Sequence, residues 1–145
     1  MVDVEGVTCH ALLDTRAGSS YASATLLDRI GVHQVRKIEM MLGVTTREVE
    51  LTSVSVSTLA GNFQLAVEVN RVHKAALLEL ENPRYLRIIG RYPHLNGVKM
   101  LDEDAKTALP VHLTLGASEI ARVKRDQAPR VGTPGEPVAD ITRFG

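Results

Sequence analysis

The sequence predicts a mainly β domain with two or three short helices, and three observations support that class. Apolar and polar residues alternate through residues 7–13, as expected for a strand, and this strand leads directly into Asp14. The same alternation occurs on both sides of the Ala60-Gly61-Asn62 turn, which indicates an antiparallel hairpin with one solvated face. A third apolar segment, residues 111–115, stops at Gly116. With 145 residues, of which 44% are hydrophobic, the chain can form one domain with a sizeable core.

The segment after Asp14 predicts a short helix and then a hairpin. Ser23 is a suitable N-cap for a helix over residues 24–30, and Gly31 would end that helix at its C′ position. Residues 37–42 then run into a glycine, and a second strand-like segment follows. We therefore expect a β-hairpin whose tip lies around residues 43–46.

The second half of the chain is less regular before it returns to a clear strand. Asn82-Pro83 and Tyr92-Pro93 interrupt it, and a short helix over residues 84–91 fits between them. Pro110 opens the apolar strand that stops at glycine, and residues 117–124 follow with a helical pattern.

The chain divides into a folded domain and a tail. We assign residues 1–128 to the domain and residues 129–145 to an extended tail rich in proline and glycine. Within the tail, Val138–Phe144 is a candidate edge strand. The chain starts in strand-like sequence and stops at Phe144-Gly145, which suggests a segment excised from a longer protein.

Composition argues against several classes of function. The 17 basic and 17 acidic residues cancel and form no basic stripe, so we expect no nucleic-acid partner. No apolar run approaches the roughly 18–20 residues that span a bilayer, so we expect no membrane role. Asp3 and Glu5 argue against a signal peptide, and the single cysteine, Cys9, fits a reducing, intracellular and most simply cytoplasmic location. We expect no metal or other cofactor, because the five histidines show no ligand spacing: His10, His33, His73, His94 and His112.

Asp14 is the most informative residue of the chain. It ends an apolar run and is followed by Thr15, Arg16 and the small residues 17–20. Burying an ionised carboxylate at the end of a strand is unfavourable unless it is paired with another group or its pKa shifts. The simpler interpretation is an acid that caps a turn. For Ser19-Ser20, local turn bonding is the simplest interpretation, since no nucleophile motif surrounds them.

Three elements in a fixed order favour a functional role for Asp14. The strand that ends in Asp14-Thr15, with Ala17 beyond it, comes first. A hairpin with Gly43 near its tip comes second, and the apolar strand that ends in Leu115-Gly116, followed by a helix, comes third. Each element alone is weak evidence for a functional site, but their order and spacing make the combined pattern more specific.

These elements resemble the retropepsin-like aspartic peptidase segment of Pao/BEL-type LTR retrotransposon polyproteins, as found in nematodes. The resemblance covers nearly the whole chain, including the tail from Gly135 to Gly145. It rests on these segments: Asp14-Thr15-x-Ala17-Gly18-Ser19-Ser20-Tyr21, Tyr92-Pro93-His94-Leu95, Leu109-Pro110-Val111-His112-Leu113 and Leu115-Gly116-Ala117-Ser118.

The resemblance implies a single-lobe acid protease fold and peptide-bond hydrolysis without a cofactor. A chain with one such loop must form a homodimer, in which Asp14 and its symmetry mate share a proton across a two-fold axis. Thr15 would brace the two loops, and an extended peptide or polyprotein would be the substrate. The resemblance also implies a loop around the dyad (Arg16, Ala17, Gly18), a flap (Leu42, Gly43, Val44), apolar pocket residues that include Ile38, and a second apolar-Gly element (Leu115, Gly116).

Arg16 departs from the family pattern, which has glycine at this position. Losing glycine costs about 1 kcal/mol or more if the backbone there needs an unusual φ. A guanidinium within ~4–6 Å of the dyad lowers a carboxylate pKa by roughly 1–3 units and leaves no proton to donate. We therefore expect weak or absent activity unless Arg16 points to solvent. The alternative is a catalytically inactive pseudo-peptidase that serves as a dimerisation or peptide-binding module.

Overall fold

The computed structural model describes residues 1–32, 36–43, 45–100 and 104–145. The fold is mainly β with three short helices, which confirms that part of the sequence prediction. The strands are β1 (Val2–Val4), β2 (Val7–Leu13), β3 (Ser20–Ser23), β4 (Arg36–Leu42), β5 (Thr45–Ser57), β6 (Gln64–Val72), β7 (Leu78–Glu81) and β8 (Ala108–Leu115). The helices are α1 (Ala24–Arg29), α2 (Tyr85–Arg91) and α3 (Ala117–Val123), with a 3-10 turn, η1, at Pro93–Leu95.

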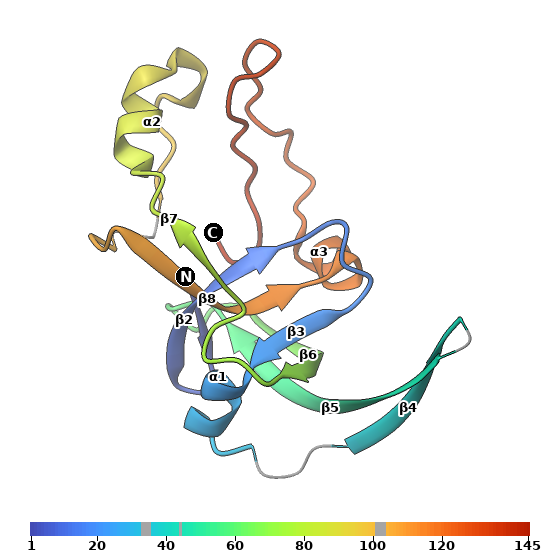
Figure 1. The fold of residues 1–145 in the computed structure, drawn as a ribbon. Coiled ribbons are helices and arrows are strands. Elements are labelled where there is room, and N and C mark those ends of the chain that lie inside the picture. Colours follow the sequence, from blue (N-terminus) through green and yellow to red (C-terminus); the bar gives the residue numbers. More distant parts are fainter. Residues whose placement is uncertain (33–35, 44, 101–103) are drawn as a thin grey trace.

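The strands form one sheet in the order β1-β2-β8-β3-β6-β5-β4, and β7 pairs with β8 (Figure 1). The sheet closes on itself because β1 also pairs with β5. Most neighbours are antiparallel, but β2 runs parallel to β8 and β3 runs parallel to β6. The parallel pair of β2 and β8 decides the position of the candidate site.

The β5–β6 hairpin follows the predicted alternation. Its register runs from Leu51 opposite Asn70 to Ser57 opposite Gln64. Val54 and Val56 are buried, and so are three alternate residues of β6, while the polar residues between them are more exposed. These valines join residues of α1, β8 and α3 in the core, which includes Leu26, Leu27, Leu113, Leu115 and Val123.

Helix α1 begins and ends as its sequence predicts. Ser23 is the N-cap, and its Oγ accepts a hydrogen bond from the Leu26 amide at 3.2 Å. Gly31 has a φ of +73°, which glycine adopts without strain. The amides of Gly31 and Val32 donate to the carbonyls of Asp28 and Leu27, which is a Schellman ending.

The strand-like start of the chain forms β1, but two short strands have no clear signal in the sequence. β3 and β7 have only four residues each, too few to show a period of two. β8 begins at Ala108, two residues before the expected start at Pro110, because β7 pairs with this part of β8 and places Glu79 opposite Pro110.

The tail differs from the expected edge strand. Instead of a strand over residues 138–144, the described chain has two isolated antiparallel bridges, Lys124 with Thr142 and Arg130 with Ala139. Figure 1 shows the tail leaving α3, extending beyond the sheet and returning to its starting point. Residues 125–141 contain three prolines and two glycines, which disfavour a continuous ladder. The end of the tail is anchored, because Phe144 is 8% exposed and lies edge-on to Phe63.

No helix within the described ranges is both long enough and apolar enough to cross a membrane.

Candidate active site

Asp14 lies where two parallel strands end side by side. β2 and β8 pair through Leu12 with Thr114 and through Leu13 with Leu115. The Asp14 amide continues this pairing and donates to the Leu115 carbonyl at 3.0 Å. Because parallel strands end at the same edge, the loop after β2 and the glycine after β8 meet there. The structure thus brings together two of the three elements singled out in the sequence.

The two segments interlock beyond this first contact. The Ala117 amide donates to the Ala17 carbonyl at 2.9 Å. A Cβ on Gly116 would lie 2.8 Å from the Ser19 carbonyl carbon and 3.0 Å from the Ala17 oxygen. Real Cβ atoms do not approach main-chain atoms so closely, so this position requires glycine. Gly116 therefore allows the loop after Asp14 to cross directly over the start of α3.

The Asp14 carboxylate is bound by the loop that follows it. Its Oδ1 accepts a hydrogen bond from the Arg16 amide at 2.9 Å, and the Asp14 carbonyl accepts one from Ala17 at 3.2 Å. The Asp14 side chain is half-buried, and Thr15 and Gly18 are exposed. The loop thus holds one carboxylate oxygen by a backbone amide and leaves the carboxyl group partly accessible.

Arg16 fits this loop without backbone strain. Among the non-glycine residues that the structure describes, only Glu5 and Arg84 have a positive φ, so Arg16 has an ordinary conformation. The penalty for replacing a conformationally special glycine does not apply here. Arg16 is exposed, and it forms no ion pair with Asp14 in the described part of the chain.

Ser20 has a larger role than local turn bonding. Its Oγ accepts a hydrogen bond from the Gly116 amide at 3.0 Å and donates one to Glu119 Oε2 at 2.8 Å. Its carbonyl accepts a hydrogen bond from Asn70 Nδ2 at 3.1 Å. Ser20 is 2% exposed, so these bonds lie away from water. Nothing local in the sequence signals them, because Gly116 and Glu119 are 96 and 99 residues away along the chain.

The third predicted element is a hairpin, as expected. Leu42 pairs with Thr45, and Gly43, with a φ of +65°, lies at the turn between them. Val44 and the side chains of Ile38 and Leu42 lie outside the described part of the chain. Figure 1 shows the hairpin of β4 and β5 extending from the closed sheet, with its tip apart from the loop between β2 and β3. In this single chain the hairpin and the loop between β2 and β3 therefore lie apart.

Cys9 lies in the core of the part of the chain that the structure describes. Cys9 is 6% exposed and belongs to the core, and burial raises the pKa of its thiol to about 11. A thiol with a raised pKa is a poor nucleophile near neutral pH. Among the residues described, no group of three His, Cys, Asp or Glu side chains is placed to hold a metal ion.

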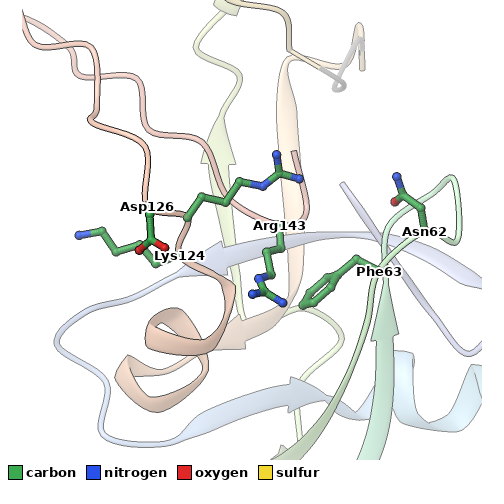
Figure 2. A pocket seen from close by; sticks show the side chains of 6 residues that line it. Asn62, Phe63, Lys124, Asp126 and Arg143 are labelled. Atoms are coloured by element: carbon green, nitrogen blue, oxygen red, sulfur yellow. The ribbon is translucent and has the colours of Figure 1, made fainter.

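A separate hollow of about 460 Å³ lies where the tail returns to the domain, and Figure 2 shows its lining. Arg143 lies over the Phe63 ring, with its guanidinium carbon 5.4 Å from the ring centre. The other lining residues are Asn62, Lys124, Arg125 and Asp126. The four charged residues are exposed and Asp14 is not part of the lining, so we assign this hollow no role in chemistry at Asp14.

Comparison with known proteins gives no match, whether with protein-family models, curated proteins or solved structures. By themselves, the fold and the site define a mainly β domain in which the loop after Asp14 packs against a strand that ends at Gly116.

Proposed function

We propose that this protein is a homodimeric aspartic endopeptidase of the retropepsin type, from a Pao/BEL-like retrotransposon polyprotein. The proposal rests on the hydrogen bonds and the close main-chain packing between the Asp14 loop and the Leu115–Ala117 segment. Two parallel strands end at the same edge of the sheet. One ends at a half-buried aspartate, and the other ends at a position that requires glycine. Hydrogen bonds hold the Asp14 main chain and one carboxylate oxygen, and the side chain is half-buried.

A pair of such carboxylates provides the chemistry. In the proposed dimer, Asp14 and the partner's Asp14 face each other across the two-fold axis. Two carboxylates about 3 Å apart cannot both ionise, so they hold one proton between them. The ionised group takes a proton from a water molecule that attacks the peptide carbonyl, and the protonated group gives a proton to the carbonyl oxygen or leaving nitrogen. The pair then titrates as a unit.

The other assigned residues position the dyad and the substrate. Thr15 is exposed on the loop and is available to brace the partner's loop. The hairpin of β4 and β5 would fold over an extended peptide in the dimer and bind it largely through main-chain hydrogen bonds. The single cysteine is consistent with an intracellular site of action.

A second candidate function, an inactive peptidase-like dimerisation or binding module, is favoured by Arg16. A dimer brings two guanidinium groups to the loops that carry the dyad. If each comes within ~4–6 Å of the carboxylates, it favours their ionised forms and lowers their pKa by roughly 1–3 units. A fully ionised pair has no proton to donate.

Peptide cleavage between about pH 4 and pH 7 by the parent chain and two variants separates these functions. We expect the parent to cleave a mixed peptide library, Asp14→Asn to be inactive, and Arg16→Gly to be at least as active as the parent. If only Arg16→Gly cleaves, the native protein is the binding module.

Sedimentation gives an independent measurement, because the proposal requires a dimer of about twice the 15.8 kDa chain mass. A protein that remains monomeric at the concentrations used for cleavage would contradict both candidate functions.

A further inference from the structure

The N-terminus of α3 is capped by a residue from outside the helix. Gly116 is the N-cap, but it has no side chain with which to bind an amide of the first turn. Glu119 stands at the third helical position, where a glutamate ordinarily reaches back to the N-cap amide. Here the Gly116 amide donates instead to Ser20 Oγ, and Ser20 Oγ donates to Glu119. The Ser20 hydroxyl thus stands between the two partners of an ordinary capping box.

The two hydrogen bonds fix the direction of the Ser20 proton. A hydroxyl has one proton, and a backbone amide can only donate. Because Gly116 donates to Ser20 Oγ at 3.0 Å, the hydroxyl proton is free to go to Glu119 Oε2 at 2.8 Å. An ionised acceptor makes this the stronger kind of hydrogen bond. Removing Glu119 would leave a buried hydroxyl without this acceptor.

The capping contact is continuous with the Asp14 loop. Ser20 is the first residue after the loop, and Gly116 lies between two residues that bind the loop main chain. Leu115 accepts from the Asp14 amide, and Ala117 donates to the Ala17 carbonyl. Any shift of Gly116 relative to Ser20 therefore changes the hydrogen bonds on both sides of the Asp14 carboxylate.

We propose that Glu119 is a positioning residue for Asp14, acting through the Ser20 hydroxyl. The inference rests on the proposed function for its effect on catalysis, but the positioning itself is a property of the folded chain. An ordinary acid in the first helical turn, favoured only by the helix dipole, would stabilise α3 but would not hold the Asp14 loop.

Amide hydrogen exchange measured by NMR tests the positioning without any cleavage. The variants are Glu119→Leu, which removes the acceptor, and Glu119→Gln, which keeps an acceptor oxygen. We expect Glu119→Leu to raise the exchange rates of the Asp14 and Ala117 amides about tenfold relative to the Val67 amide in β6. Glu119→Gln should change them less than about threefold. The matched control is Glu81→Leu, at an exposed acid of β7, which should leave all three rates unchanged.

Two results would overturn the inference. One is a Glu119→Leu variant whose loop amides exchange at the parent rate. The other is an equal rise at Val67, which would mean a general loss of stability. Should Glu119→Leu not fold, Glu119→Ala removes the same acceptor with a smaller side chain and is scored in the same way.

Kinetics then connect the positioning to the proposed function. With an active parent, we expect Glu119→Leu to lower kcat about tenfold with KM within about twofold, and Glu119→Gln to retain most of kcat. A change in KM alone would contradict the positioning role. If no variant and no parent cleaves, the proposed peptidase function fails, while the exchange rates still decide whether Glu119 holds the loop.

Discussion

The replacement Gly116→Ala tests the physical basis of the site most directly. The added Cβ would lie 2.8 Å from both the carbon and the oxygen of the Ser19 carbonyl and 3.0 Å from the Ala17 oxygen. All three are main-chain atoms, so no side-chain rotation can relieve the contact. The loop after Asp14 and the start of α3 must separate by several tenths of an ångström.

The expected loss of stability follows from three terms. Forced overpacking in a well-packed region costs about 1–3 kcal/mol. The separation weakens two hydrogen bonds, Gly116 to Ser20 Oγ and Ala117 to the Ala17 carbonyl, each worth about 0.5–1.5 kcal/mol. Replacing glycine with alanine also reduces the entropy of the unfolded chain and returns about 0.4–1 kcal/mol. The net expectation is a free energy of unfolding lower by roughly 2–4 kcal/mol.

Urea unfolding at neutral pH measures this change, with thermal melting as a second assay. For a chain of this length the expected drop in Tm is roughly 4–16 °C. The matched control is Gly90→Ala within α2, where a Cβ meets no atom within 4 Å and φ is ordinary. That variant should be neutral or up to about 1 kcal/mol more stable. If Gly116→Ala is as stable as the parent, the two segments are not in the close contact described here, and the argument for a fixed Asp14 fails with it.

Other predictions concern the rest of the domain. Burial, with Arg29 nearby, lowers the pKa of His112 below its ordinary value of 6.5. The unfolded state therefore binds more protons, so the stability contributed by neutral His112 is complete above about pH 6.5 and falls as pH drops below it. Unfolding at about pH 7.5 and 5.5 should show a smaller pH-dependent loss in His112→Gln than in the parent. Leu27→Ala, at a side chain of α1 with 0% exposure, should lower the free energy of unfolding by about 2–5 kcal/mol. Leu86→Ala, at a side chain that is 79% exposed, should change it by less than about 0.5 kcal/mol, and equal effects would contradict the assigned core.

Local patterns in the sequence account for much of the fold. The hairpin of β5 and β6 was predictable because alternation on a sheet with one buried face appears directly in the chain. Helix α1 was predictable because its cap at Ser23 and its end at Gly31 are local. The position of Asp14 at the end of a strand was predictable for the same reason.

The contacts that hold the site were not predictable in this way. Ser20 meets Glu119 and Asn70 only because β3 lies between β8 and β6, an order that no short pattern reveals. The requirement for glycine at position 116 could be guessed from the strand that stops there, but its cause is a main-chain crossing about 100 residues away in sequence. In place of the candidate strand over residues 138–144, the tail has isolated bridges and the packing of Phe144 against Phe63, a contact between segments far apart in the sequence that no local pattern reveals.

The geometry of Arg16 separates two properties that a glycine in this loop provides together. One is a backbone amide directed at the carboxylate, and Arg16 already supplies that amide to Asp14 Oδ1 at 2.9 Å with an ordinary φ. The other is the absence of a side chain where the partner loop approaches. Since the first property is retained, any gain in activity in Arg16→Gly must come from removing bulk and positive charge. Arg16→Gln keeps most of the bulk and loses the charge, so activity in both variants would identify the charge as the inhibitory feature, whereas activity in Arg16→Gly alone would identify the bulk. Equal activity in the parent and both variants would mean that the Arg16 side chain stays in solvent in the dimer as well.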